Sequence, residues 1–178
     1  MTKTATKSRT RRPGDDRLYV LYVFLTDGPM TAAFLRRNRV VSRMIEIKGD
    51  QTLEQLHYAI FDAFGREDEH MYEFQIGGTG PTDSKARRYV LRSSLKEEPG
   101  ASWDVSAFVG SLGLKVGDAF GYWFDFGDNW RHQINVVEIQ DVPARGKFPK
   151  ISDREGDNPP QYVNWDEVAE FEAPRRRA

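Results

Sequence analysis

The residues best suited to chemistry lie in one short segment, "DFGDNWRH" at 125–132, which holds two aspartates, an arginine and a histidine. Histidines and carboxylates are the usual groups of general acid–base catalysis. The letters "DFG" also occur in protein kinases, but the glycine-rich loop, the strand lysine and the catalytic loop of a kinase are absent from this sequence. Catalysis at this segment therefore depends on whether its aspartates and its histidine face the same way.

The alternating aromatic residues around this segment predict a β-hairpin, and its register decides which side chains share a face. A two-residue loop at Asp128 and Asn129 would set aromatic residues against polar ones along one whole side. A three-residue loop that begins at Gly127 gathers the apolar residues on one face, with Phe126 opposite Trp130, and leaves the polar residues on the other. We therefore predict the three-residue loop.

In that register the polar side chains of the segment separate. Asp125 lies opposite Arg131 and pairs with it across the strands, a contact worth about 1 kcal/mol or less. Asp128 accepts backbone N–H groups in the turn. His132 lies on the apolar face, away from Asp125, so we do not expect these two side chains to act together.

The three histidines offer a second kind of chemistry. His57 lies on the apolar stripe of a predicted helix, and His70 and His132 lie on the apolar faces of predicted strands. If the helix packs on that face of the sheet, the three rings converge and, with a carboxylate, could bind zinc or another divalent metal. No HxH or HExxH spacing supports such a site, and the alternative is three hydrogen-bonded histidines at the edge of an aromatic core.

The elements that must position these residues follow from hydrophobic periodicity and capping signals. The clearest helix begins at the N-cap Thr52, has Gln55 in a capping-box position, and ends at Gly65. We expect strands over 17–27, 40–50 and 70–78, a loop or short helical insert in 28–39, a short helix over 104–114 capped by Asp104, an irregular loop over 144–162 and a last helical turn or two in 163–173. The order predicts an α+β fold: a mainly antiparallel or mixed β-sheet, one central amphipathic helix packed on one face, and a C-terminal aromatic β-hairpin.

Charge divides the chain into three parts. Residues 1–17 carry six basic and two acidic side chains, and three arginines lie close to the C-terminus, so the rest of the chain is acidic. We expect a disordered basic tail at 1–17, a single domain at 18–172 and a basic tail at 173–178. The tails could bind the phosphates of nucleic acid or simply be solubilising. The absence of cysteine excludes disulfides and thiol chemistry, and no apolar run is long enough to span a membrane.

Four segments, in this order, resemble the plasmid pRiA4b ORF-three-like family of insertion-element passenger proteins: "TLEQLHYAIFDAF", "HMYEF", "LGLKVGDAFGYWFDFGDNWRHQI" and "NPPQY". The resemblance runs from about Leu18 to Tyr162. Arg43 matches an arginine that family members carry in the strand before the helix, although Ser42 replaces their aromatic residue. Many relatives carry a cysteine-containing stretch in the final loop, where this chain has "ISDREGDNPPQY". The matching signature residues are Arg43, Asp125, Gly127, Asp128, Trp130 and Arg131.

The resemblance implies an association with plasmids or mobile elements, but no established molecular activity. Some relatives have a resolvase-type name, yet this chain lacks the nucleophilic serine amid arginines and the DNA-binding helical module that a serine recombinase needs. We therefore expect a non-catalytic, cytoplasmic interaction or accessory domain without a cofactor, whose partner is a protein. The alternatives are a metal-dependent hydrolase or nuclease at His57, His70 and His132, and a nucleic-acid binder that uses the basic tails. The predicted partner surface consists of Trp123, Pro159, Pro160, Tyr162 and Trp165.

Overall fold

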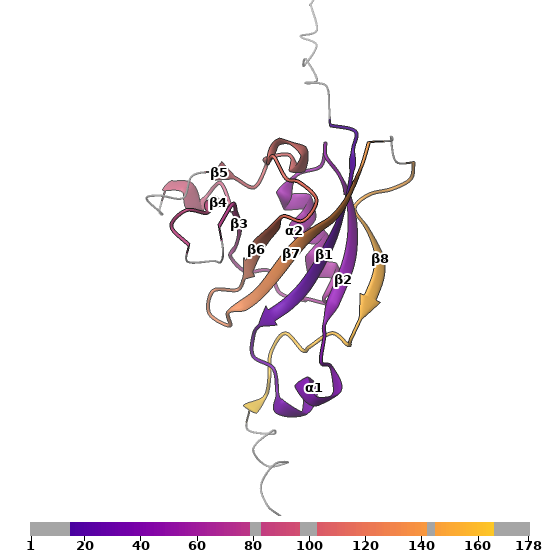
Figure 1. The fold of residues 1–178 in the computed structure, drawn as a ribbon. Coiled ribbons are helices and arrows are strands. Elements are labelled where there is room, and N and C mark those ends of the chain that lie inside the picture. Colours follow the sequence, from indigo (N-terminus) through magenta and orange to yellow (C-terminus); the bar gives the residue numbers. More distant parts are fainter. Residues whose placement is uncertain (1–14, 79–82, 97–102, 142–144, 166–178) are drawn as a thin grey trace, which may run out of the picture.

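The computed structural model describes residues 15–78, 83–96, 103–141 and 145–165. Within them a single mixed sheet has the strand order β5-β4-β3-β6-β7-β1-β2-β8 (Figure 1). The strands are β1 (Leu18–Asp27), β2 (Ser42–Lys48), β3 (Tyr72–Ile76), β4 (Arg87–Val90), β5 (Trp103–Asp104), β6 (Ala119–Phe124), β7 (Trp130–Gln140) and β8 (Lys150–Glu155). All these neighbours pair antiparallel except β4 and β5, which pair in parallel over two residues. The predicted α+β class is confirmed.

Among the described residues two α-helices accompany the sheet, α1 (Ala32–Arg37) and α2 (Leu53–Ala63), with short 3-10 helices at Ser94–Lys96 and Val109–Ser111. α2 lies across one face of the sheet, behind β6, β7 and β1 in the view of Figure 1, and α1 lies at one end of the molecule. The predicted capping box of α2 is present, since Thr52 accepts the N–H of Gln55 and the Gln55 side chain accepts the N–H of Thr52. Gly65, at φ +62°, ends the helix as predicted. The buried stripe of α2 then forms the core with the sheet: Leu53, Leu56, His57, Ile60 and Ala63.

The β6–β7 hairpin has a different register from the predicted one. Phe124 pairs with Trp130 and Trp123 pairs with Arg131, so the connecting loop has five residues, 125–129. The shift is two residues, which leaves every strand side chain on its predicted face because the side-chain period of a strand is two. The predicted cross-strand pair of Asp125 and Arg131 is therefore wrong. Asp125 is instead a loop residue with positive φ, 53°.

Two other expectations about local structure are wrong. Residues 150–155 are not irregular but form the edge strand β8, which pairs with β2. Asp104 does not cap a helix, because the 3-10 helix begins only after Phe108. The residues between them bind the start of α2: the carbonyl of Ala107 accepts the N–H of Leu53, and the carbonyl of Val105 accepts the N–H of Glu54. Of the helix predicted over 104–114, only Val109–Ser111 is helical, as a 3-10 helix. The last helical turn predicted in 163–173 falls almost wholly outside the described residues.

The described part of the chain begins three residues before the predicted domain start. Asp15 accepts two hydrogen bonds from the Arg17 side chain and one from the hydroxyl of Tyr19. This contact with Arg17 lowers the pKa of Asp15 to about 2. Its side chain lies against Gly49 and Gly110, where an added Cβ would be 2.7 Å and 2.2 Å from the nearest Asp15 atom. Of the described helices, neither is long and apolar enough to cross a membrane.

Candidate functional site

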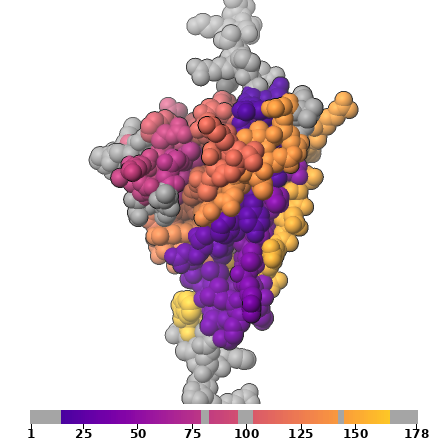
Figure 2. All heavy atoms as spheres, viewed as in Figure 1, coloured from indigo at the N-terminus to yellow at the C-terminus, as the bar shows by residue number. Residues whose placement is uncertain are grey.

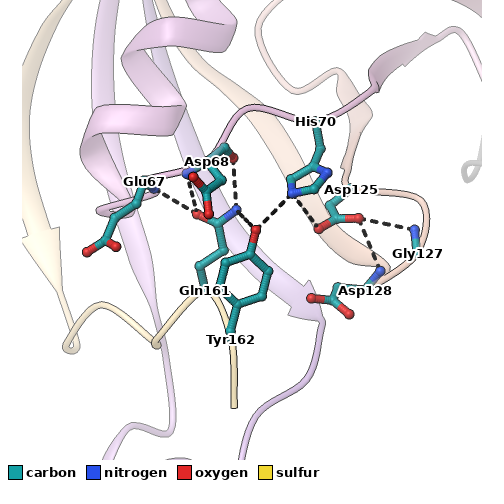
Figure 3. A network of polar contacts seen from close by, with 8 residues as sticks. All are labelled: Glu67, Asp68, His70, Asp125, Gly127, Asp128, Gln161 and Tyr162. Atoms are coloured by element: carbon teal, nitrogen blue, oxygen red, sulfur yellow. Dashed lines mark hydrogen bonds and ion pairs between the residues drawn. The ribbon is translucent and has the colours of Figure 1, made fainter. Parts of the chain in front are cut away.

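The segment 157–162, which contains the "NPPQY" motif, is fastened to the loop that follows α2 (Figure 3). The buried side chain of Gln161 accepts the N–H groups of Glu67 at 2.7 Å and Asp68 at 3.1 Å, and donates to the carbonyl of Asp68 at 2.8 Å. One amide side chain thereby satisfies three backbone groups that would otherwise need water. The fastening positions Tyr162, the next residue, over the same loop.

Tyr162 and the hairpin loop meet at His70. The hydroxyl of Tyr162 lies 2.9 Å from His70 Nε2, and Asp125 Oδ2 lies 3.5 Å from the same nitrogen (Figure 3). The other oxygen of Asp125 accepts the N–H groups of Gly127 at 3.2 Å and Asp128 at 3.3 Å. We predicted that Asp128 accepts backbone N–H groups in the turn, but the structure shows that Asp125 is the acceptor. Three of the four family-like segments, "HMYEF", the hairpin and "NPPQY", meet in this network.

The network resembles a catalytic Asp–His–hydroxyl triad in composition but not in geometry. In such a triad the carboxylate binds one nitrogen of the imidazole and so orients the ring, while the other nitrogen takes the proton of the hydroxyl. Here Asp125 and Tyr162 both approach Nε2 of His70. Asp125 therefore does not orient the ring through the second nitrogen as a triad carboxylate does, and the arrangement is suited to fixing the "NPPQY" segment.

Arg43 holds the same segment from the other side. The residue is 1% exposed, and its guanidinium donates to the carbonyls of Ala63 and Glu155, each at 2.8 Å, and to Asn158 Oδ1 at 2.5 Å. Burial lowers the pKa of Arg43 from its ordinary value. The side chain connects β2, the end of α2, β8 and the "NPPQY" segment, which gives this signature residue a structural role.

The two buried histidines belong to the core. His57 shares a hydrogen bond of 2.7 Å with the hydroxyl of Tyr122 and stacks on Tyr72 with ring centroids 3.6 Å apart. Burial lowers the pKa of His57 to about 3. His132 packs edge-on against Phe64, and burial together with the nearby positive charge of Arg66 holds its pKa well below the ordinary value.

The structure does not bring the three predicted metal ligands together. His57 projects from α2 onto Tyr72 and Tyr122 of the sheet, His132 lies between Phe64 and Tyr122, and the partly exposed ring of His70 lies in the Tyr162 network. In the part of the chain that the structure describes, no group of three His, Asp or Glu side chains could hold a metal ion. The geometry thus gives the metal-dependent alternative no support.

Sequence reasoning missed Arg66, a buried residue next to the signature tryptophan. Its guanidinium carbon lies 3.6 Å from the ring centroid of Trp130, and only 7% of the residue is exposed. Arg66 belongs to the charged segment "GREDEH", whose composition predicts a solvent-exposed loop. No local sequence pattern therefore indicates that Arg66 is buried.

A groove separates α1 from the "NPPQY" segment at one end of the molecule. Its volume is about 620 Å³. Figure 2 shows the surface of α1 in purple beside the yellow spheres of the last described residues. Met30, Phe34 and Arg37 line one wall of the groove, and Pro159, Pro160 and Tyr162 line the other.

The predicted partner surface is only partly assembled at this groove. Pro160, Tyr162 and Trp165 are exposed, whereas Pro159 is buried. Trp123 lies elsewhere, on the sheet face opposite the core, half-buried between Phe126 at 4.4 Å and the guanidinium of Arg131 at 5.4 Å. Three of the five predicted residues are thus exposed at or beside one groove.

Known proteins match both the sequence and the fold. Residues 32–171 match the family described as plasmid pRiA4b ORF-3-like protein. The uncharacterized protein y4hQ of Sinorhizobium fredii (strain NBRC 101917 / NGR234) is 29% identical over 136 residues, a match that covers 70% of this chain but only 59% of y4hQ. The crystal structure of MM3350 from Methanosarcina mazei Go1, a protein of unknown function, has the same fold, with a TM-score of 0.65 and 18% identity over 90% of this chain and 84% of that one. The chain therefore belongs to the plasmid pRiA4b ORF-3-like family.

Proposed function

We propose that this chain is a non-catalytic interaction domain that binds a segment of a partner protein in the groove between α1 and the "NPPQY" segment. The observation that carries the proposal is a concave, largely apolar site whose walls are tied together. The volume of about 620 Å³ lies within the range of known binding pockets, roughly 300–1,000 Å³.

One hydrogen bond connects the two walls of the groove, and two more hold the "NPPQY" wall to β2 and to the loop after α2. Asn38, which ends α1, accepts the N–H of Asp157 at 2.9 Å through its side chain. Asn158 is bound by Arg43, and Tyr162 is held by His70. A preformed groove loses little conformational entropy when a partner binds, which raises affinity.

The lining chemistry favours binding over catalysis. Among the lining residues there is no histidine, lysine, cysteine or glutamate. The hydroxyl of Thr31 accepts the N–H of Phe34 as the N-cap of α1, and no histidine among the lining residues could activate it as a nucleophile. Prolines and a half-exposed tyrosine, by contrast, are rigid anchors that bury apolar area with little loss of side-chain freedom.

Charge favours a partner segment that carries a carboxylate next to an apolar side chain. Arg36 and Arg37 at the end of α1 are exposed, and Arg37 lines the groove. Asp157 adds one negative charge to the opposite wall. An apolar side chain would occupy the space between Phe34 and Pro160, and a carboxylate would pair with Arg37.

Site-specific photo-crosslinking in the organism's own cells tests this proposal. A benzophenone amino acid replaces Pro160 in one variant and Val116, an exposed residue that does not line the groove, in a matched control. We expect a discrete crosslinked protein from position 160, its loss on adding Arg37→Glu, and no such product from position 116. Equal crosslinking at both positions, or a product from position 160 that is insensitive to Arg37→Glu, would contradict the proposal.

A further inference from the structure

Arg66 is a buried cation with no polar partner among the described residues. It follows Gly65 at the end of α2, and all three guanidinium nitrogens are buried without a hydrogen bond. Its guanidinium lies on the ring of Trp130, at 3.6 Å from the ring centroid. Stacking of this kind stabilises the cation but leaves the N–H groups, which lie in the guanidinium plane, unused.

Two more unused donors lie beside it on β7. Trp130 and His132 are two residues apart on this strand, so their side chains emerge on the same face. Nε1 of Trp130 and both ring nitrogens of His132 are buried and make no hydrogen bond of good geometry in the described chain, although the Tyr122 backbone lies close enough to His132 to favour its protonated form slightly. Because its low pKa keeps the imidazole of His132 neutral, the ring offers one N–H. Three different side chains thus present N–H groups in one buried region.

The charge of Arg66 is not neutralised by a direct contact. Burial lowers the pKa of Arg66 to about 10, so the guanidinium is still protonated at neutral pH. Asp125 attracts it through space, but the Asp125 carboxylate is already bound by the N–H groups of Gly127 and Asp128 and faces His70. A buried charge without a counter-charge is strongly destabilising, and buried N–H groups are nearly always satisfied.

We propose that Arg66, Trp130 and His132 form a binding site for one small inorganic anion of about the size of chloride. The three side chains offer many donors, and their single acceptor is the second nitrogen of the neutral His132, so they suit a ligand that only accepts hydrogen bonds. Ordered water would satisfy the N–H groups but would leave the charge of Arg66 uncompensated. The polar atoms concerned are closed to solvent, which favours a small ion over a phosphate ester. This site is separate from the proposed groove, whose lining includes none of the three residues.

Crystals of the full chain soaked in sodium bromide test the site directly, because bromide substitutes for chloride and scatters anomalously. We expect an anomalous peak within hydrogen-bond distance of the Arg66 guanidinium and the Trp130 indole nitrogen. Density for ordered water only, with no anomalous signal at these atoms, would overturn the proposal.

Urea unfolding in solution gives a second, independent readout. Bromide replaces gluconate at constant ionic strength, with unfolding followed for the wild type, Arg66→Met and a matched exposed control, Arg39→Met. A specific site raises the folding equilibrium constant about 11-fold when bromide reaches ten times its Kd. We expect this rise in the wild type and in Arg39→Met, and none in Arg66→Met. An equal rise in Arg66→Met, or no rise in the wild type, would refute the site, and if Arg66→Met does not fold the bromide crystals decide alone.

Discussion

His57 makes the stability of this protein depend on pH in a way that can be calculated. The ring is 2% exposed, stacks on Tyr72 and shares a hydrogen bond with Tyr122. Burial lowers its pKa to about 3 in the folded protein, against about 6.5 for a histidine in an unfolded chain. The unfolded chain therefore binds a proton more readily than the folded one, and the stability due to this difference is present above pH 6.5 and is lost as the pH falls toward 3.

The magnitude follows from the two pKa values. At pH 7 the ring is mostly neutral in both states, whereas at pH 5 it is protonated in nearly all unfolded molecules and still neutral in the folded ones. Lowering the pH from 7 to 5 should therefore reduce the free energy of unfolding by about 2 kcal/mol through His57 alone. This change in the free energy of unfolding depends little on the pKa of His57 in the folded protein, since both pH values lie well above that pKa.

Urea unfolding at pH 7 and pH 5 measures this effect as a difference between variants. His57→Phe removes the titrating group, so its loss of stability between the two pH values should be smaller than that of the wild type by about 2 kcal/mol. Tyr122→Phe is the matched control, because it removes the same hydrogen bond but keeps the imidazole buried. The same pH-dependent loss in His57→Phe and the wild type would show that His57 is not the buried neutral ring described above.

Two other variants test the packing around the signature motifs. Gln161→Ala should destabilise the protein by about 1–3 kcal/mol and accelerate amide hydrogen exchange at Glu67 and Asp68, because both N–H groups lose their acceptor. Gly28→Ala should cost about 2–4 kcal/mol in urea unfolding, because an added Cβ would lie 2.2 Å from the Trp130 ring and the residue has φ +152°.

Each of these variants has a control that isolates its cause. Gln161→Glu keeps an acceptor for both N–H groups, so it should preserve their protection from exchange although the bond to the Asp68 carbonyl is lost. Gly113→Ala combines a φ of +75° with open space around the new Cβ, so only backbone strain of about 1–2 kcal/mol is expected. Equal destabilisation by Gly28→Ala and Gly113→Ala would mean that contact with Trp130 is unimportant.

In the β6–β7 hairpin, hydrophobic periodicity predicts the face of each strand residue but not the pairing register. The alternation from Phe120 to Val136 predicts the face of each strand residue, and the structure confirms those faces. The same alternation cannot distinguish registers that differ by two residues, since both place the same side chains in the core. The choice is made by the loop, where Asp125 takes a left-handed conformation and its N–H binds the carbonyl of Met71, a residue distant in sequence.

The sequence by itself determined the features that depend on neighbours along the chain: the capping box of α2, its stop at Gly65, the faces of the strands and the family motifs. Tertiary structure alone decided which distant groups meet. It separated the three histidines, joined Gln161 and Tyr162 to the loop after α2, and buried Arg66 on Trp130 inside a stretch that reads as solvated. The physical reason is that periodicity and caps are local, whereas burial and ionic contacts depend on pairs of residues whose distance only the completed sheet sets.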